Sequence, residues 1–228
     1  MVAPRHFHPS EILLLGPGPS PVSYEVRAAM AAPVLGHLDP EFTALMDRVQ
    51  ADLRMLFGTE NRLTLPISGT GSAGMEATVV NLVEPGDRVV VGIHGVFGER
   101  LKEIATRQGA DVVEVRTDYG TALDPEALSD AVTAGPTTLV ALVHAETSTG
   151  VLQPLEEIAR LTAECGALLL VDCVTSLGGT AVDLDRLGID AAFSGTQKCI
   201  SVPPGLSPVS FSSRARDKVR TRTKPPVS

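Results

Sequence analysis

The sequence predicts an α/β fold with a mainly parallel sheet, and three observations support that prediction. Short runs of β-branched and apolar residues alternate with segments of helical periodicity along most of the 228 residues. Some of these runs are apolar at every position, as in LLLV at 168–171, which is typical of strands covered on both faces. Turn residues separate the segments, as in Pro85-Gly86-Asp87. Together these features indicate strand–helix repeats around a buried sheet.

Seven runs are the expected strands, and they span residues 63–67, 88–91, 112–115, 139–143, 168–171, 191–193 and 208–211. Helical spacing predicts helices at 40–57, 72–82, 98–107, 125–132 and 155–165. Asp124-Pro125 is a typical helix start, because Asp is a favoured cap and Pro fits the first turn. The prolines of LLLGPGPSPV at 13–22 exclude regular structure there. We therefore expect an N-terminal arm at 1–22 and one large domain at 23–228.

Composition excludes several classes of protein. The net charge of −8 disfavours a general nucleic-acid binder. No apolar run is long enough to span a membrane, and the N-terminus lacks the apolar core of a signal peptide. Cys165, Cys173 and Cys199 show no C-x-x-C spacing, so neither a disulfide framework nor a zinc site is expected, and a cytoplasmic location fits. The five histidines form no metal pattern, since only His6 and His8 are close in sequence.

Two groups of polar residues are expected to have structural roles. Six basic residues lie between positions 214 and 224, opposed only by Asp217. We expect them to form the solvated face of a helix rather than a site for an anionic partner. His144 follows an apolar run and is expected to be a hydrogen-bonded residue of the core.

The stretch ISGTGSAGME at 67–76 matches the G-x-G-x-x-G fingerprint of dinucleotide-binding proteins. It joins an expected strand to an expected helix, so backbone N–H groups at the helix start are placed to bind an anion. NAD binding also needs an acidic residue about 20 positions further on, where this sequence has His94. Glu99 comes later, inside an expected helix. The turn therefore predicts a site for another phosphate, or a tight turn that binds no ligand.

Two further residues favour the phosphate interpretation. Asp172 directly follows the apolar run at 168–171, at the strand end where open α/β sheets bind ligands. Lys198 lies in the small-residue turn SGTQK after the next expected strand. Alone, the aspartate would be interpreted as a helix cap and the lysine as a surface residue. Together with the turn they form the set that pyridoxal 5′-phosphate (PLP) requires: an amine for its aldehyde, a carboxylate for its ring nitrogen, and donors for its phosphate.

Several ordered blocks of the sequence resemble the class V aminotransferases, which have PLP fold type I. They include GHLDPEF, SGTGSAGMEA, HAETSTGVLQPL, LLLVDCVTSLGG and DAAFSGTQKC. The resemblance is greatest to the branch of alanine–glyoxylate and serine–glyoxylate aminotransferases. It implies an α/β large domain with a mainly parallel seven-stranded sheet flanked by helices. It also implies PLP as the cofactor and a homodimer as the assembly.

The resemblance implies roles for individual residues. Lys198 would form a Schiff base with the cofactor and move the proton during the reaction, and Asp172 would pair with the pyridinium nitrogen. Phe97 and Val174 would pack on opposite faces of the cofactor ring, although Phe97 taken alone would be a core residue. The other implied contacts are Ser68, Gly69, Thr70 and Gln197 to the phosphate, Thr147 to the phenolic oxygen, and Gly18 to the substrate carboxylate. For Gly18, a simple tight turn is an equal interpretation.

The sequence departs from this family at its C-terminus. Relatives continue with the end of the large domain and a small C-terminal domain. That part carries an arginine for the substrate carboxylate and a loop that reaches the phosphate of the partner subunit. We therefore expect this chain to be truncated at its C-terminus, with the small domain absent.

The implied reaction transfers an amino group from a small amino acid, alanine or serine, to a 2-oxo acid, glyoxylate, by a ping-pong route. Three alternatives stay open. One is an inactive or partly folded fragment that at most binds PLP. Another is a class V lyase or desulfurase, which needs a mobile cysteine, and Cys199 beside Lys198 is badly placed for that. The third is an NAD-dependent oxidoreductase, which the missing ribose acid disfavours.

Overall fold

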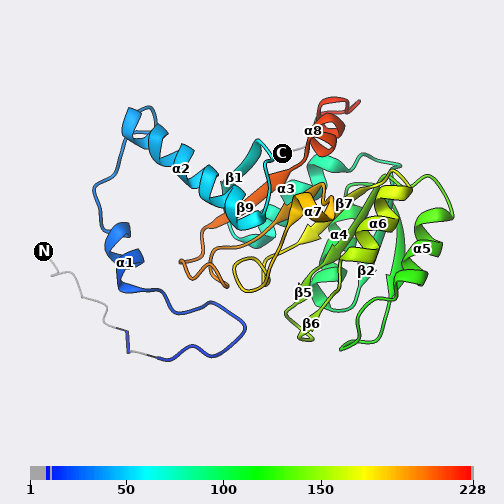
Figure 1. The fold of residues 1–228 in the computed structure, drawn as a ribbon, viewed down its shortest axis with the longest axis horizontal. Coiled ribbons are helices and arrows are strands. Elements are labelled where there is room, and N and C mark those ends of the chain that lie inside the picture. Colours follow the sequence, from blue (N-terminus) through cyan, green and yellow to red (C-terminus); the bar gives the residue numbers. More distant parts are fainter. Residues whose placement is uncertain (1–8, 11, 227–228) are drawn as a thin grey trace, which may run out of the picture.

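A seven-stranded sheet forms the centre of the protein, as the sequence predicts (Figure 1). The computed structural model describes residues 9–10 and 12–226. All seven predicted strands are confirmed, and the observed bounds differ from the predicted ones by at most two residues. In order across the sheet, the strands are β1 (Leu63–Ser68), β9 (Leu206–Phe211), β8 (Ala191–Phe193), β7 (Leu168–Asp172), β4 (Leu139–Val143), β2 (Arg88–Ile93) and β3 (Asp111–Arg116).

The sheet is mainly parallel. The strands from β8 to β3 run in the same direction, and β9 is antiparallel to its two neighbours, β8 and β1. All residues of β4, β7 and β8 are buried, which explains their nearly uniform apolar sequences. Because parallel strands end at the same edge of a sheet, the segments that follow β2, β4, β7 and β8 meet there.

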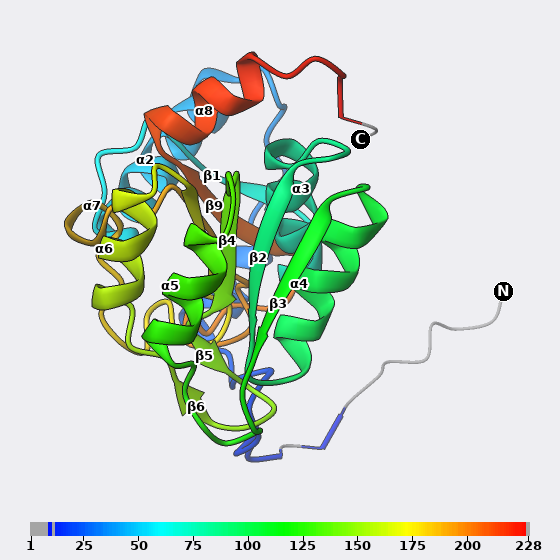
Figure 2. The ribbon, with the colours of Figure 1, turned by 90° about the vertical axis from the view of Figure 1, so that its right-hand side faces the viewer.

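Helices cover both faces of the sheet (Figure 2). One core packs α5, α6 and α7 against one face, and a second core packs α3, α4 and α8 against the other. Their bounds are α3 (Gly71–Leu82), α4 (Val96–Arg107), α5 (Pro125–Thr133), α6 (Glu156–Glu164), α7 (Leu184–Leu187) and α8 (Ser213–Arg220). Neighbouring residues of a strand serve different cores, as Val171 and Leu170 do on β7. Within the described residues, no helix is long and apolar enough to cross a membrane.

Helix starts follow the local sequence. Asp124 caps α5 by accepting a hydrogen bond from Glu126 N at 3.0 Å, with Pro125 in the first turn, as predicted. The long helix α2 (Pro40–Phe57) has the predicted bounds, and Asp39 caps it in the same way. Its end is set by Gly58, which takes the left-handed conformation with φ of 60°.

Several short elements were not predicted. Helix α1 (Tyr24–Met30) has seven residues and buries none of them. Helix α7 has four residues. Strands β5 (Ala145–Glu146) and β6 (Val151–Leu152) have two residues each and form a separate small sheet. Elements this short contain too few residues to show a period.

The basic segment at 214–224 is less solvated than predicted, and the prediction of a free helix face is wrong for half of its cations. Arg214 pairs with the buried Asp190 at 3.1 Å. Lys218 pairs with Asp87 at 2.9 Å. Arg222 donates to three backbone carbonyls around the C-terminal end of α3, at 2.8 to 2.9 Å. The segment is therefore fixed to the domain by charge-assisted hydrogen bonds.

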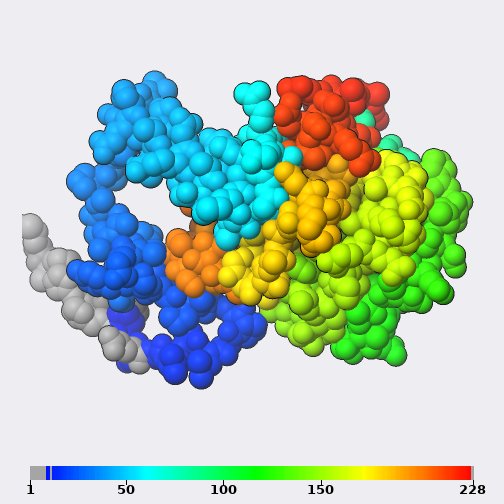
Figure 3. Space-filling view, viewed as in Figure 1, coloured from blue at the N-terminus to red at the C-terminus, as the bar shows by residue number. Residues whose placement is uncertain are grey.

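The N-terminal segment extends away from the body of the domain (Figure 3). Residues 12–22 have no helix or strand, as predicted for 13–22, and the division between arm and domain at residue 22 stays a prediction. Ser20 ties this segment to the turn after β8, because its N–H donates to Gln197 O at 2.8 Å and its Oγ to Lys198 O at 2.7 Å. His6 and His8 lie outside the described residues.

Helix α3 crosses very close to the sheet because position 74 is glycine. A Cβ at Gly74 would lie 2.0 Å from Ser207 Oγ and 3.1 Å from Phe193 Cβ. The first of these distances is far below van der Waals contact, so only glycine permits this approach of helix to sheet. The third glycine of the G-x-G-x-x-G stretch therefore has a packing role that needs no ligand.

We predict that Gly74→Ala lowers the free energy of unfolding by roughly 1–3 kcal/mol, the usual cost of overpacking. Ser207→Gly removes the clashing side chain. Gly74→Ala should therefore cost less stability in the Ser207→Gly protein than in wild type. Urea unfolding of the four proteins measures the effect. Gly16→Ala is the control, because no atom lies within 4 Å of a Cβ there. A Gly74→Ala protein as stable as wild type would contradict the packing argument.

Candidate functional site

The segments after four strands surround a cavity at the carboxyl edge of the sheet. In the sheet register, Asp172 at the end of β7 lies beside Val143 of β4 and Phe193 of β8. The segments that follow β1, β2, β7 and β8 supply the walls. The residues lining the cavity are Thr70, Gly71, Ser72, Met75, Phe97, Asp172, Val174 and Gln197. The fold thus brings together five residues that the sequence analysis named from separate motifs.

Asp172 is the buried acid of this cavity, with 2% of its surface exposed. Burial raises the pKa of its carboxyl to about 7, and the negative charge of Glu146 acts in the same direction. The hydrogen bond from Val174 N, at 2.8 Å, and the charges of Arg100 and Lys198 lower the pKa in part. A cationic group against this carboxyl would stabilise its charged form. The assignment of Asp172 to a pyridinium nitrogen stays a prediction, and its environment suits that role.

The glycine-rich turn presents the start of α3 to the cavity. Thr70 lines the cavity together with Gly71 and Ser72, which the sequence analysis did not name. Ser68 and Gly69 are not in the lining, and their predicted phosphate contacts stay predictions. Because α3 begins at Gly71, the N–H groups of Gly71 and Ser72 belong to its first turn and have no partner within the helix. The sequence predicted such N–H groups at a helix start near Ser72, and the structure places that start one residue earlier, at Gly71.

Lys198 follows Gln197 of the cavity wall but is not itself in the lining. Its Nζ donates to Pro17 O at 2.9 Å. A Cβ at Gly18 would lie 2.8 Å from this Nζ, and Gly18 has a φ of +119°, which strongly favours glycine. The N-terminal segment therefore packs against the lysine amine. The predicted contact of Gly18 with a substrate carboxylate stays a prediction.

Of four further predicted cofactor contacts, three line the cavity and Thr147 does not. Phe97, Val174 and Gln197 line the cavity. The Oε1 atom of Gln197 is buried and has no hydrogen-bond partner among the described residues. Thr147 is outside the lining, with its Oγ1 2.6 Å from Thr175 Oγ1. The packing of Phe97 and Val174 on two faces of a ring stays a prediction.

Glu146 is a buried carboxylate beside the cavity that the sequence analysis missed. It is 1% exposed and accepts hydrogen bonds from Phe97 N at 3.1 Å, Ser148 N at 3.0 Å and Ser148 Oγ at 2.7 Å. Gly95 allows this approach, because a Cβ there would lie 2.2 Å from Glu146 Cγ. Glu146 therefore anchors the first turn of α4 and the backbone of Phe97. The available signal was its position beside Thr147 in HAETSTG.

Two histidines near the strand ends are buried. His94 has no exposed surface, and neither of its ring nitrogens has a partner among the described residues. Burial lowers the pKa of His94 and of His144. The prediction that His144 is fully hydrogen-bonded is wrong for its Nδ1, which has no partner within the described part of the chain. In residues 9–10 and 12–226, no group of three or more His, Cys, Asp or Glu is placed to hold a metal.

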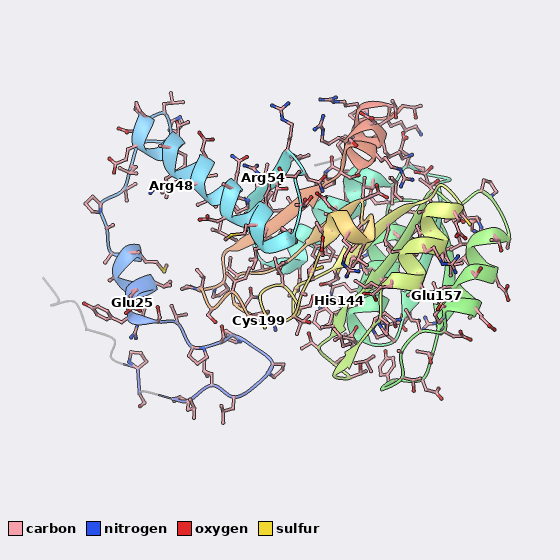
Figure 4. All side chains as sticks on the ribbon, viewed as in Figure 1. Glu25, Arg48, Arg54, His144, Glu157 and Cys199 are labelled. Carbon is pink, nitrogen blue, oxygen red and sulfur yellow. The ribbon has the colours of Figure 1, made fainter. Side chains whose placement is uncertain are left out.

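Cys199, labelled with His144 in Figure 4, is exposed on the loop that follows Lys198. Its Sγ donates to Thr175 O at 3.3 Å. A Cβ at Gly179 would lie 2.6 Å from this sulfur, so the thiol is packed against the neighbouring loop. This placement fits a small packed thiol better than a mobile nucleophile.

Comparison with known proteins identifies the family. Residues 23–224 match the family described as aminotransferase class-V. The chain belongs to the class V aminotransferases. It is 41% identical to an alanine–glyoxylate aminotransferase of Drosophila melanogaster, over 100% of this chain and 58% of that protein. It is 42% identical to a (S)-ureidoglycine–glyoxylate transaminase of Bacillus subtilis, over 92% of this chain and 51% of that protein.

Solved structures give the same result for the fold. The crystal structure of an alanine–glyoxylate aminotransferase from Nostoc sp. superposes with a TM-score of 0.93 and 48% identity, over 98% of this chain and 60% of that one. A cysteine desulfurase from Thermococcus onnurineus is similar at a TM-score of 0.73 but only 18% identity, which shows a shared fold alone. The chain thus spans between about half and three-fifths of the length of its aminotransferase relatives.

PLP is the cofactor of this family, and the residues around the cavity fit it. Gln197 Oε1 is a buried polar atom that lacks a partner. The first turn of α3 offers unbonded N–H groups at Gly71 and Ser72 for an anion. Asp172 is a buried carboxyl, and a cationic ring nitrogen against it would lower its raised pKa and stabilise the carboxylate. Lys198 supplies an amine next to Gln197 of the cavity wall, and its charge acts on Asp172.

The raised pKa of Asp172 predicts how stability of the cofactor-free chain depends on pH. Its folded-state pKa of about 7 lies above the ordinary value of 3.8, so the stability that the protonated acid contributes is complete at low pH and is lost as the pH rises through about 7. The free energy of unfolding of wild type should therefore fall by roughly 2–3 kcal/mol between about pH 5 and about pH 8 because of this group. In Asp172→Asn this part of the fall should be absent. Urea unfolding of both proteins at both pH values measures it.

The exposed Asp217 provides the matched control for this experiment. Asp217→Asn should leave the pH dependence of wild type intact. If Asp172→Asn also kept the wild-type dependence, the carboxyl of Asp172 would not be titrating in this range, and the argument from its burial would be wrong.

Proposed function

We propose that this chain is the cofactor-binding part of an aminotransferase that moves an amino group from a small amino acid, alanine or serine, to glyoxylate. The observation that carries the proposal is the buried Asp172 in the wall of a cavity of a class V aminotransferase domain. Lys198 follows Gln197 of that wall, and its charge lowers the pKa of Asp172. The names of its relatives support the acceptor, since both an alanine–glyoxylate and a ureidoglycine–glyoxylate enzyme use glyoxylate.

Each residue of the site has a distinct task in this proposal. When bound, PLP supplies an aldehyde that takes up amino groups and a ring that accepts electrons. Lys198 would hold the cofactor through its amine, and would then accept and return the proton of the substrate carbon. Asp172 would keep the ring nitrogen protonated. In a ping-pong reaction, Lys198 would act as the base in both half-reactions.

The remaining residues would position the cofactor. The first turn of α3, with Thr70, and the side chain of Gln197 would hold the phosphate. Phe97 and Val174 would confine the ring between them, and Glu146 would keep Phe97 in place through the backbone of α4. The hydrogen bond from Lys198 Nζ to Pro17 O would hold the amine in place before a cofactor binds.

None of the three alternatives is favoured over this function. A lyase or desulfurase is favoured by fold likeness alone, and Cys199 is packed beside Gly179 on the loop after Lys198. A fragment that folds and binds PLP without turnover shares every residue of this site, so activity is what separates it from the proposal. NAD binding lacks an acidic residue at position 94, where a buried histidine lies.

We predict that the purified chain binds PLP with a new visible absorption band and that borohydride fixes the cofactor on Lys198. Lys198→Ala should abolish this covalent capture, because none of the residues that line the cavity is a lysine. Peptide mass spectrometry of the reduced protein identifies the modified residue. Turnover of alanine with glyoxylate, measured as pyruvate formed, then separates an enzyme from a binding fragment.

Lys102→Ala is the matched control, because Lys102 lies on the surface of α4 and pairs with Glu99 at 3.0 Å. It should bind PLP as wild type does. Capture of PLP on surface lysines only, with Lys198 unmodified, would overturn the proposed site.

We also propose that the enzyme is a cytoplasmic homodimer. The described cysteines are all free, which suits a reducing compartment. The N-terminal segment carries exposed apolar side chains, with 84% of Leu15, 98% of Val34 and 83% of Leu38 accessible. Apolar surface of this extent marks an interface in soluble proteins, and a second copy of the chain is the occupant that we propose.

The dimer proposal predicts a change of mass in solution. Replacing Leu15, Val34 and Leu38 together by Ser should convert the dimer to monomer, because the apolar contact would be lost. Light scattering after size exclusion measures the mass. The control replaces Tyr119 and Leu152, which are 57% and 52% exposed elsewhere, and should leave the dimer intact. A wild-type monomer, or a triple variant that stays dimeric, would contradict this interface.

A further inference from the structure

Arg100, on the second turn of α4, lies between two walls of the cavity. Its Nη1 donates to Ser72 Oγ at 3.1 Å, and its guanidinium carbon lies 5.3 Å from the centre of the Phe97 ring. Ser72 and Phe97 both line the cavity. The two contacts therefore place the guanidinium at the rim, beside the first turn of α3.

The charge of Arg100 has no acidic partner within the part of the chain that the structure describes. The other cations of α4 are paired with acids on the same helix, Lys102 with Glu99 and Arg107 with Glu103. Arg100 instead has a neutral hydroxyl and an aromatic ring as its contacts. The positive charge of Arg100 also acts inside the cavity, because it lowers the pKa of Asp172, whereas burial raises that pKa.

A phosphate group in this cavity would need such a cation. It carries between about one and a half and two negative charges at neutral pH. The start of a helix offers the equivalent of only about half a positive charge. The walls otherwise add a neutral amide, Gln197, and the carboxylate of Glu146 is buried behind them. A fixed guanidinium beside Ser72 would balance this excess of negative charge.

We propose that Arg100 is a phosphate-binding residue of the cofactor site and acts together with the first turn of α3. The proposal rests on the function proposed above. The anion that Arg100 would bind is the cofactor phosphate at the α3 end of the cavity. A substrate carboxylate is the other anion that the site must hold. It is expected near the reacting amine of Lys198, which packs against Gly18.

The test compares PLP with pyridoxal, which has the same ring and aldehyde but no phosphate. Arg100→Gln should weaken PLP binding about tenfold or more, the usual effect of losing a charge-assisted hydrogen bond, and should leave pyridoxal binding unchanged. Arg100→Lys should fall between, because it keeps the charge and loses the fork of donors. Arg107→Gln is the control, an exposed arginine of the same helix that pairs with Glu103. Titration of the visible absorption band gives the dissociation constants.

Inorganic phosphate provides a second readout that does not use the cofactor. It should raise the melting temperature of the cofactor-free wild type and of Arg107→Gln, and should do so less for Arg100→Gln. Equal weakening of PLP and pyridoxal would overturn the proposal, because Arg100 would then act only by holding Phe97. Unchanged PLP binding would overturn it as well. A wild type that gains stability from phosphate through Arg100 but takes up no PLP would instead overturn the proposed function.

Discussion

The parallel pairing of β7 between β4 and β8 is the constraint on which the site depends. It places Asp172 level with Val143 and Phe193, so the segments that follow all three strands leave the sheet at one edge. The buried carboxyl, the turn that ends at Lys198 and the anchor Glu146 are then neighbours without any long loop. The apolar sequence of β7 makes that position buried, and burial is also what raises the pKa of Asp172.

Close approach of the backbone to neighbouring side chains is the second condition, and glycines supply it around the site. Gly74 lets α3 pack on the sheet, and Gly71 faces Val174, where a Cβ would lie 2.8 Å from Cγ2. Gly95 makes room for Glu146, and Gly18 for Lys198. The G-x-G-x-x-G stretch is therefore a feature of helix–sheet packing and anion binding together, which explains its likeness to a dinucleotide fingerprint in a protein of another family.

The sequence predicted the sheet because its strands are apolar runs bounded by turn residues, and it predicted Asp172 and Lys198 because each follows such a run. It could not predict which residue of the turn faces the cavity, since that depends on whether α3 starts at Gly71 or Ser72. It missed Glu146 and Arg100 because nothing local marks a carboxylate that bonds a distant N–H or an arginine that spans two walls. The ion pairs of Arg214 and Lys218 were missed for the same reason, since their partners are distant in sequence.

The central claim is that the strand ends of this chain alone form a cofactor cavity with its phosphate end at α3. A crystal structure of the chain with PLP bound tests it most directly. We expect the phosphate at the first turn of α3 beside Ser72, the ring between Phe97 and Val174, and the ring nitrogen facing Asp172. A cofactor bound with its phosphate away from α3, or with Asp172 facing no part of the ring, would show that the cavity has another role.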